Sequence, residues 1–477
     1  MRGMGLSARW GAAIGAAAIV GSLLTPAAVA SDAGTPAIVK TPSTLTTTSK
    51  KLAPGIVLKT IHDPSGPYIV HELVIDPTKA LSIDVVTAGT EMGYWARTST
   101  MGANAGAIAA INGDFSVWPG RPQHPFVEDG QLKQTGLHTG STFGERRDEA
   151  RGYIRHEKFT VRVKNPVMHT AVKLGGWNTG DPGPNSIHGY SPYGGMEEQP
   201  PSGGCAVRMA PDGKLRWGAK KFGLFRRYRV LASRCGNRRM AVKPGTVVLA
   251  ARGSGDGGKF LRGVKPKQML RLRFWNGMKD VMDLMGGAPL LVHHHTVNAD
   301  PNCHTWFCSR NPRTGVGVTH AGKVMWVTVD GRSRNSVGMT IYGFAKYMLS
   351  LGADEAVNLD GGGSSTMWVK GQGIVNDPSD GAGERPLTNA LVILPGADVG
   401  ENEPLSYKMG AALTAGRDGS IAVSPSAARR AMNLALADPG STGGLMDWLV
   451  SSLGASARRL LPHGSLAMAR SFRRSVH

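Results

Sequence analysis

Residues 356–366 read AVNLDGGGSST and join a short apolar run to a polar, glycine-rich turn. The run has the composition of a buried strand, and the three glycines let the backbone turn sharply and let a ligand approach its N–H groups closely. Asp360 therefore stands where a rigid strand meets a loop. A single Asp-Gly pair is an ordinary turn signal, so a functional site is indicated only if this design recurs.

The design recurs at two other places in the chain. Residues 107–111, AIAAI, run into Asn112-Gly113-Asp114, and residues 324–329, VMWVTV, run into Asp330-Gly331-Arg332. Ordinary turn chemistry explains one such turn more easily than three. We therefore predict that loops at these three strand ends form one site.

Arginine supplies the complementary charge. Arg313 lies in NPRT (311–314), Arg332 belongs to the second acid turn, and Arg385 lies in ERPLTN (384–389). A guanidinium group binds phosphate through a planar fork, although an isolated arginine is more often a surface ion-pair partner. Several acids together with several arginines suit a substrate that joins a sugar to a phosphate.

These stretches resemble the phosphodiester glycosidase family and occur in the family's order. The matching stretches are AINGDF (110–115), NPRTGVG (311–317), VDGR (329–332), NLDGGGSST (358–366) and ERPLTNAL (384–391). The resemblance spans about residues 55–394, but between about 136 and 283 only GWN (176–178) and YSPYG (190–194) match. It implies an α+β fold, with a single mixed-sheet catalytic domain and packed helices, and a hydrolase that cleaves the glycosidic bond of sugar-1-phosphodiesters.

The implied reaction determines the roles that the site must fill. A departing phosphodiester is a weak base and needs little help from a general acid, so the enzyme must stabilise its charge and supply a carboxylate that activates water or attacks the sugar. Asp114 and Asp360 are the first candidates for that carboxylate, followed by Asp330 and Glu384. The arginines and the glycine-rich turn would hold the phosphate, and asparagines would bind sugar hydroxyls or brace the loops. The residues expected to bind substrate are Asn112, Asn178, Arg313, Arg332, Gly361, Gly362, Gly363, Ser364, Ser365, Arg385 and Asn389.

Histidines and metal ions enter as alternatives. His124 follows the first acid turn and is either a proton carrier or a loop histidine with satisfied hydrogen bonds. Residues 293–295 are three consecutive histidines, but successive side chains of a regular strand alternate faces and cannot all reach one ion. Oxygen ligands from Asp114 and Asp360 would suit calcium. No metal ligand is assigned: we expect that no cofactor is required, with a divalent cation such as calcium as the alternative.

Four cysteines allow three pairings. Proximity favours Cys205 with Cys235 and Cys303 with Cys308. A zinc site is the alternative because a histidine adjoins Cys303, but the spacings match no common zinc motif. Two structural disulfides are therefore predicted, as is usual in an exported protein.

Residues 1–30 have the features of a cleaved secretory signal. Arg2 and Arg9 precede the apolar run 10–24, and Ala28-Val29-Ala30 forms an A-x-A-like cleavage site. The apolar run is shorter than the roughly 20 residues that span a bilayer, which argues against a retained anchor. The protein is therefore expected to be secreted or associated with the cell wall.

The charge of the chain bears on its partners. Lysine and arginine number 55 against 34 aspartates and glutamates, a formal net charge of +21. Such a surface attracts anionic polymers. The expected partners are therefore a phosphoglycan substrate, the anionic cell wall or a membrane surface. The alternative is that the basic residues are scattered over a solvated surface and bind no partner. Basic residues are not interleaved with aromatic ones, so nucleic acid is not expected.

Composition divides the chain into four parts. After the signal, residues 31–54 are rich in Thr, Ser, Ala and Pro and are predicted to be a flexible linker. Residues 55–397 form the predicted glycosidase domain, in which short Val- and Ile-rich runs indicate that strands dominate. Residues 398–477 are an Ala- and Arg-rich extension, predicted to be partly helical.

One segment of the predicted domain has a helical pattern. Thr340 is its N-cap and Gly352 follows its end. The apolar face of this helix consists of Ile341, Phe344, Ala345, Met348 and Leu349.

Two functions of other classes remain open. The same loops and basic surface would serve a non-catalytic binder of anionic wall polysaccharide, which would keep its binding and effect after Asp360→Asn. A phosphodiesterase would instead cut the P–O bond. Oxygen from labelled water would then appear in the phosphate rather than in the sugar.

Overall fold

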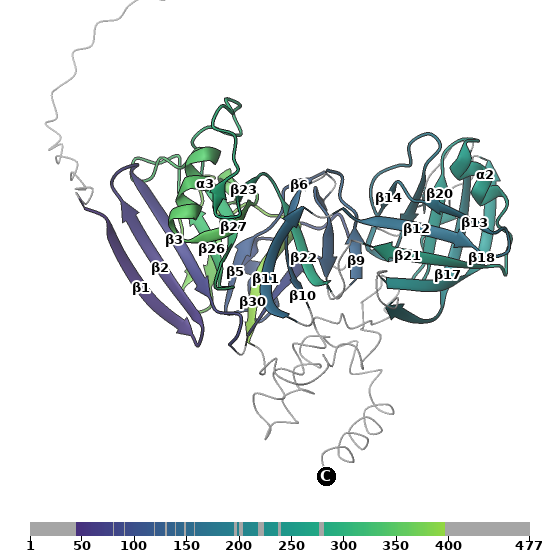
Figure 1. The fold of residues 1–477 in the computed structure, drawn as a ribbon, viewed down its shortest axis with the longest axis horizontal. Helices are drawn as coiled ribbons and strands as arrows, with labels where there is room; N and C mark the ends of the chain where they lie inside the picture. The colour runs from purple at the N-terminus through teal and green to yellow at the C-terminus, as the bar shows by residue number, and fades with distance from the viewer. Residues whose placement is uncertain are drawn as a thin grey trace, which may run out of the picture. The chain divides into compact units, whose positions relative to one another are not determined.

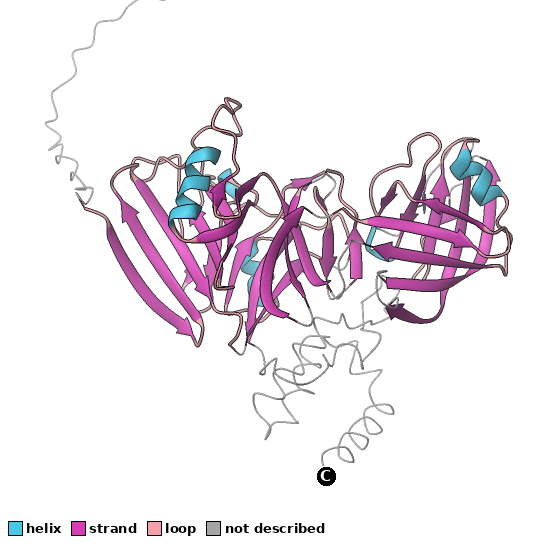
Figure 2. Ribbon diagram, viewed as in Figure 1, coloured by secondary structure: helices cyan, strands magenta, loops and turns pink. Residues whose placement is uncertain are grey.

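Strands dominate the regular structure of the part of the chain that is described, as Figure 2 shows. The computed structural model describes residues 44–395 except 80, 90, 119, 129–130, 139, 147–148, 157, 195–197, 200–203, 218–223, 237–239 and 276–280. The predicted signal (1–30) and C-terminal extension (398–477) lie outside the described residues. Within them the helices are α1 (Thr98–Asn104), α2 (Asp256–Arg262) and α3 (Ile341–Ser350), with 3-10 turns at η1 (Pro192–Gly194) and η2 (Gly362–Ser364). The α+β prediction is therefore only partly correct, because the helices are few and short.

The sheet that carries most of the acid turns has eight antiparallel strands (Figure 1). In spatial order they are β1 (Thr46–Ala53), β2 (Ile56–Asp63), β3 (Tyr68–Ile75), β26 (Val324–Val329), β25 (Arg313–Thr319), β27 (Ala353–Asn358), β23 (Leu290–His293) and β24 (Thr296–Val297). All six residues of β26 are buried. The sheet is covered on both faces there, which explains why this strand is continuously apolar rather than alternating.

A second sheet, of five antiparallel strands, packs against the first through a shared hydrophobic cluster. Its strands in spatial order are β29 (Gly373–Ile374), β28 (Met367–Val369), β5 (Ala109–Asn112), β30 (Asn389–Pro395) and β4 (Leu81–Thr87). Ile111 and Ile393 from this sheet meet Leu73 and Trp326 from the first in that cluster. Further clusters contain residues of α1 with the five-stranded sheet and of α3 with the eight-stranded sheet.

The register of these two sheets brings the acid turns together. Arg313 lies opposite Val329, Gly315 lies opposite Asn358, and Ala390 lies opposite Asn112. Because paired strands are antiparallel, the ends of β5, β26 and β27 lie beside the beginnings of β25 and β30. Loops far apart in the sequence therefore gather at one end of the strands of the two sheets.

A further five-stranded antiparallel sheet borders the same cluster. Its strands in spatial order are β11 (Glu149–His156), β10 (Ser141–Arg146), β22 (Val281–Gly287), β8 (Phe126–Glu128) and β9 (Gln131–Gln134). Phe126, Phe143 and Met285 contribute to the cluster from this sheet. A two-stranded ribbon, β6 (Ser116–Val117) with β7 (Arg121–Pro122), follows the first acid turn.

Residues 160–275 form another eight-stranded sheet with hydrophobic clusters of its own. Its strands in spatial order are β13 (Thr170–Lys173), β12 (Thr160–Asn165), β21 (Met269–Trp275), β18 (Leu224–Gly236), β17 (Gly204–Trp217), β20 (Val247–Ala251), β15 (Ile187–Tyr190) and β14 (Gly176–Trp177). Only β14 and β15 pair in parallel. A short ribbon joins β16 (Glu198–Gln199) to β19 (Met240–Ala241).

The predicted linker is partly wrong. Thr46–Ala53 is strand β1, which pairs with β2 from Thr46 opposite His62 onward. Its side chains are mostly exposed, so the sequence lacks the hydrophobic alternation that marks a half-buried strand. Its β-branched threonines favour extended structure, and its two lysines are typical of a protected sheet edge.

The predicted helix is confirmed as α3. Thr340 accepts a hydrogen bond from the backbone N–H of Gly343 at 2.9 Å, as an N-cap does. Gly352 follows the helix with a φ of +96°, a conformation that glycine adopts without strain. Ile341, Phe344, Ala345 and Met348 are buried, and Leu349 is half-buried.

Both predicted disulfides are present, so the cysteines hold no zinc. Cys205 and Cys235 are cross-strand neighbours in β17 and β18. Cys303 and Cys308 close a loop of the eight-stranded sheet that includes β25. None of the helices that the structure describes is both long and apolar enough to cross a membrane.

Candidate active site

Three of the predicted motifs meet at the side chain of Asn112, those that contain Asn112 itself, Thr314 and Asp360. Its Nδ2 donates to the carbonyl of Asp360 at 2.8 Å. Its Oδ1 accepts from Thr314 Oγ1 at 2.7 Å and from the N–H of Thr366 at 3.0 Å. Asn112 is fully buried, so it ties both ends of the glycine-rich turn and strand β25 to the end of β5.

Asp114 is buried and surrounded by donors. Its Oδ1 accepts from His124 Nδ1 at 2.6 Å and from the N–H of Phe115 at 2.7 Å, and its Oδ2 accepts from the N–H of His124 at 2.7 Å. Burial would lower the pKa of His124, but the charge of Asp114 and this hydrogen bond outweigh burial and raise that pKa above its ordinary value. The ring edge with Nε2 lies against Gly140. His124 is thus a partner that orients Asp114.

Asp360 is less buried than the other three candidate acids. Asp114, Asp330 and Glu384 are buried at 0%, 4% and 5% exposure, whereas Asp360 is half-buried. Burial raises the pKa of Asp360 to about 6, against the opposing effects of the Ser364 hydroxyl, the Gly361 N–H and the charge of Arg385. A carboxylate that titrates near neutral pH and remains accessible suits a general base or nucleophile.

The raised pKa of Asp360 predicts a pH-dependent cost to stability. The folded protein binds the proton more tightly than an unfolded carboxyl with its pKa of 3.8, so the free energy of unfolding should fall as pH rises from about 3.8 to about 6. Asp360→Asn removes this cost. The variant should gain on the order of 2 kcal/mol over wild type at about pH 7.5 and little at about pH 3.5, as urea unfolding can measure. The same difference at both pH values would contradict the assignment.

Arg332 and Arg385 flank a carboxylate that the sequence did not single out, Asp380. Arg385 donates from Nε to Asp380 Oδ2 at 2.9 Å and from Nη2 to Oδ1 at 3.0 Å. Arg332 Nη1 lies 3.9 Å from Asp380 Oδ1. A Cβ added to Gly363 would lie 1.9 Å from this carboxylate, and one added to Gly362 would lie 2.9 Å from Arg332 Nη2. The two arginines therefore hold an anion directly over the glycine turn.

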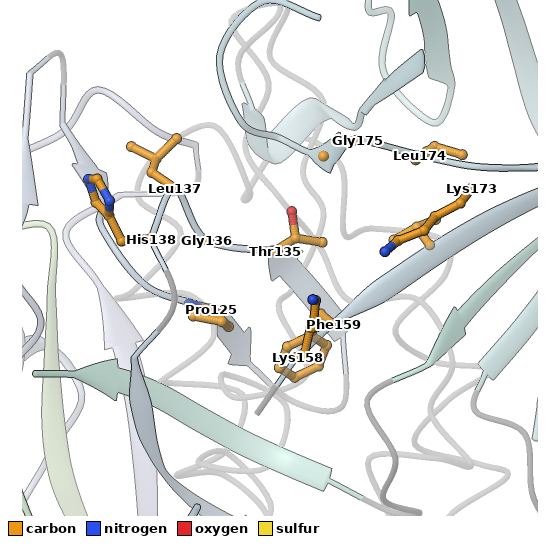
Figure 3. Close-up of a pocket in the computed structure, with 12 residues that line it drawn as sticks. Pro125, Thr135, Gly136, Leu137, His138, Lys158, Phe159, Lys173, Leu174 and Gly175 are labelled. Atoms are coloured by element: carbon orange, nitrogen blue, oxygen red, sulfur yellow. The ribbon is translucent and has the colours of Figure 1, made fainter. Parts of the chain in front are cut away.

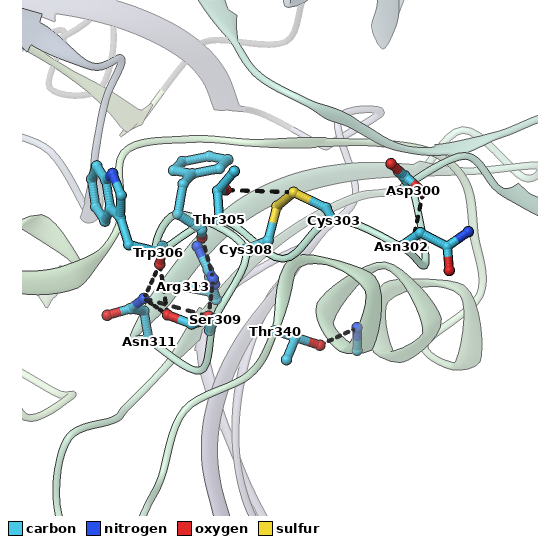
Figure 4. Close-up of a disulfide and its surroundings, with 12 residues drawn as sticks. Asp300, Asn302, Cys303, Thr305, Trp306, Cys308, Ser309, Asn311, Arg313 and Thr340 are labelled. Carbon is cyan, nitrogen blue, oxygen red and sulfur yellow. Dashed lines mark hydrogen bonds between the residues drawn. A yellow bond between two sulfur atoms is a disulfide. The ribbon is translucent and has the colours of Figure 1, made fainter.

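Arg313 is placed differently from these two arginines. It is buried and donates to the carbonyls of Phe307 and Ser309 at 2.8 and 2.5 Å and to that of Met339 at 2.8 Å. Burial, followed by the charge of Arg332, lowers its pKa to about 10. Figure 4 shows Arg313 beside the loop that the Cys303–Cys308 disulfide closes. Its bonds organise this loop rather than present an open fork to phosphate.

The same loop is connected to Arg332 through Asn311. Asn311 Nδ2 donates to Ser309 Oγ at 3.2 Å, and its Oδ1 accepts from Arg332 Nη2 at 3.0 Å. Arg332 has a φ of +62°, an uncommon conformation for a residue with a side chain. The disulfide loop therefore helps to position Arg332, one of the two arginines that flank the carboxylate of Asp380.

Most backbone N–H groups of the glycine turn already have acceptors. The N–H of Gly361 donates to Asp360 Oδ1, that of Gly362 to the Pro312 carbonyl, and that of Ser364 to the Gly361 carbonyl. The predicted cradle of four N–H groups for a phosphate is therefore largely occupied within the turn itself.

The hydroxyl groups of this turn are less fully engaged. Oγ of Ser364, Oγ of Ser365 and Oγ1 of Thr366 are buried without a hydrogen-bond partner of ordinary geometry among the described residues, although Ser364 lies close enough to Asp360 to lower its pKa. Buried polar atoms are normally satisfied. Three adjacent hydroxyls in this state retain hydrogen-bonding capacity for a polar ligand or water.

Asp330 and Glu384 are engaged by the fold. Asp330 Oδ1 accepts from the N–H of Asp377 at 3.0 Å, and its Oδ2 lies 3.5 Å from Nε2 of the buried His71. Glu384 accepts from both the hydroxyl and the N–H of Ser99, in the first turn of α1. Both carboxylates tie loops to strands or helices.

The remaining asparagines lie in different surroundings. Asn389 is fully buried, and its Oδ1 accepts from the N–H of Asp114 at 2.9 Å, so it holds the first acid turn. Asn178 belongs to the turn after β14, where its Nδ2 donates to the Lys133 carbonyl at 2.6 Å and to Ser191 Oγ at 2.7 Å. The hydrogen bonds of Asn178 join it to those two loops and not to the acid turns.

A cavity of about 170 Å³ lies elsewhere, as Figure 3 shows. Lys158, Lys173 and His138 are among its lining residues. It includes none of the predicted site residues. The strand-end loops remain the candidate active site because the candidate acids and Arg332 and Arg385 gather there and not at this cavity.

Sequence reasoning missed the residues whose role depends on long-range contacts. The partner of Thr314 is Asn112, and a second partner of Asp380 is Arg332; both are brought near only by the fold. Asp380 had one available signal, its position five residues before Arg385 in a Gly-rich loop. His124 was considered, but its bond to Asp114 was not foreseen.

Comparison with known proteins bears directly on these turns. Residues 234–394 match the model of the phosphodiester glycosidase family. The resemblance is thereby confirmed over roughly a third of the chain, a segment that includes Asp330, Asp360 and Arg385 but not Asp114.

Individual proteins are similar to parts of this chain. The prophage-derived protein YomE of Bacillus subtilis (strain 168) is 42% identical over 84 residues, which are 18% of this chain and 13% of YomE. A hypothetical protein from Synechocystis has a TM-score of 0.60 at 18% identity, covering 73% of this chain and 64% of that one. A Burkholderia pseudomallei protein named as exported has a TM-score of 0.54 at 24% identity, covering 69% and 74%. The two structures share the fold, and this chain spans less than two thirds of YomE and of the Synechocystis protein.

Proposed function

We propose that this protein hydrolyses the glycosidic bond of sugar-1-phosphodiesters at the strand-end loops around Asp360. One observation carries the proposal: a carboxylate whose pKa burial raises to about 6 lies at the turn where two arginines flank the carboxylate of Asp380. The site thus combines a base for water or a nucleophile for the anomeric carbon with positive charge for a departing phosphate. The family match supports the same reaction.

The residues would divide the work as follows. Asp360 would activate water or attack the sugar, since it alone of the four candidate acids is not fully buried. Arg332 and Arg385 would stabilise the negative charge that develops on the phosphate. Asp114, held by His124 and Asn389, would fix the neighbouring turn and would tune Asp360, whose pKa its charge helps to raise.

We propose that the reaction needs no cofactor. The oxygens of Asp114 already accept three hydrogen bonds, which leaves this carboxylate poorly suited to a calcium ion shared with Asp360. Activity with and without a chelator tests this directly. Loss of activity with chelator and recovery with calcium would overturn it.

Substrate class and location are part of the proposal. The net charge of +21 favours a phosphoglycan of the wall or another anionic extracellular glycan as the substrate. Two disulfides and the signal-like residues 1–30 support export. Sequencing the N-terminus of the secreted protein would test cleavage after residue 30.

The decisive experiment follows both products and the position of the new oxygen. Purified protein is incubated with sugar-1-phosphodiesters, including N-acetylglucosamine-1-phosphodiesters, in ¹⁸O-labelled water. Release of ¹⁸O-labelled sugar with an unlabelled phosphomonoester is expected. Label in the phosphate would mean a phosphodiesterase. No release from several sugars by folded protein, with retained binding of anionic glycan, would favour a polysaccharide binder.

Asp380 should compete with the substrate for the two arginines. Because its carboxylate occupies them in the free protein, Asp380→Asn should lower the KM for a phosphodiester by on the order of 2–5-fold, the value of a partly exposed ion pair. The kcat should change less. Steady-state kinetics measure both, and a raised KM would instead show that Asp380 positions Arg385.

A further inference from the structure

We propose that His293, His294 and Glu355 form a binding site for Zn²⁺, separate from the acid turns. The two histidines end β23 and begin its turn into β24, and Glu355 lies on the neighbouring strand β27. One ligand atom from each of the three side chains lies within 4.8 Å of the others. Among the residues that the structure describes, no other such group of three His, Cys, Asp or Glu side chains occurs.

The distances suit a shared ion. Nδ1 of His293 lies 3.0 Å from both carboxylate oxygens of Glu355, and Nδ1 of His294 lies 3.3 Å from Oε1. Two ligands of a tetrahedral zinc ion, each about 2.0–2.1 Å from it, are roughly 3.3 Å apart. The two imidazole rings lie side by side, with centroids 4.0 Å apart and planes inclined by 32°. Small rotations of the side chains would direct all three groups at one ion.

The backbone of the turn explains how consecutive histidines reach the same point. His294 and His295 have φ values of +48° and +57°, so the alternation of a regular strand stops at His293. A two-residue hairpin turn with both φ values positive normally takes Asn-Gly or Asp-Gly. The backbone of both histidines is therefore strained. Residues with side chains in this conformation occur often at functional sites.

The scaffold holds this turn from two sides. The N–H of His295 donates to the Asp354 carbonyl at 2.9 Å, and the N–H of His294 donates to Glu355 Oε1 at 3.1 Å. The side chain of Glu355 is 16% exposed, while those of His293 and His294 are 50% and 80% exposed. The carboxylate is thus fixed by the sheet, and both imidazoles remain open to an ion arriving from solvent.

The donor set indicates which ion is bound. Imidazole with one carboxylate suits zinc and neighbouring transition metals, whereas calcium and magnesium prefer oxygen ligands throughout. Three protein ligands leave further coordination positions to water. We therefore expect Zn²⁺, with Cu²⁺ and Ni²⁺ as competitors in vitro.

The test uses the full chain without a polyhistidine tag. Isothermal titration with Zn²⁺ should show one strong site, and Co²⁺ should give the visible absorption bands of a low-symmetry nitrogen and oxygen site. His293→Ala, His294→Ala and Glu355→Gln should each weaken Zn²⁺ binding at least 10-fold, since losing only a hydrogen bond to a metal ligand already costs about 10–100-fold.

His295→Ala is the matched control. It lies in the same turn and has the same strained backbone, but its side chain is not part of the group. It should bind Zn²⁺ like wild type. Equal weakening in this variant, unchanged binding in the other three, or no saturable binding to the folded wild-type protein would overturn the proposal.

Discussion

Asparagine in place of Asp360 should lower the rate of sugar release by about 10²–10⁴-fold, the range that a positioned acid or base contributes. The substitution keeps the size of the side chain and removes the charge that would activate water or attack the sugar. Because Asp360 is half-buried at a strand end and its main-chain N–H is bound to the Gly113 carbonyl, the loop should keep its shape. Initial rates with a sugar-1-phosphodiester measure the effect.

Asp354→Asn is the control for this prediction. Asp354 lies within β27, the strand that leads to Asp360, and not at the acid turn. It should retain wild-type activity. The pH profile adds a second readout: in the wild type the rate should fall as pH decreases through about 6, where Asp360 becomes protonated. Asp360→Asn with full activity would refute the proposed role, and a profile flat through pH 6 would argue that another group is the base.

A methyl group added at Gly113 should destabilise the fold by about 3 kcal/mol, toward the upper end for overpacked sites. The new Cβ would lie 2.2 Å from Asn389 Oδ1 and 2.5 Å from the Asn389 carbonyl oxygen. Part of this clash is with main chain, so a side-chain rotation cannot relieve it. β5 and β30, which pair beside this point, would have to separate. Urea unfolding of Gly113→Ala measures the loss.

Gly183→Ala is the matched control, because a Cβ there meets no atom within 4 Å. It should leave stability nearly unchanged. The activity of Gly113→Ala should also decrease by more than unfolding alone would cause. Asn389 accepts from the N–H of Asp114 at this contact, so the clash would also move the first acid turn. Wild-type stability in Gly113→Ala would mean that the two strands tolerate a wider separation than the structure indicates.

Local patterns of the sequence predicted what depends on neighbouring residues. The helix α3 was predictable because its cap, its apolar face and its terminal glycine all lie within thirteen residues, 340–352. Strand β26 was predictable because a sheet buried on both faces requires a continuous apolar run. The disulfides followed from proximity, which pairs cysteines across one hairpin and across one loop.

Features that depend on long-range contacts were not predictable in the same way. β1 is an exposed edge strand and therefore carries no hydrophobic alternation. The sequence identified the acid turns but could not separate accessible Asp360 from the buried acids, because burial is set by loops hundreds of residues apart. The same limit hid the contact of Asp380 with Arg332, and the clustering of His293 and His294 depended on a turn with two positive φ values, which are uncommon outside glycine.

The chain leaves the sheet after β11, forms the separate sheet of residues 160–275, and returns at β22, and both β11 and β22 pair with β10. Exit and re-entry on either side of one strand mean that this excursion can vary in length, or be exchanged for another, without shifting the register of the strands that carry the acid turns. Its separate apolar clusters make such exchange easier. In evolution, this excursion could thus change without altering the loops that carry the acid turns.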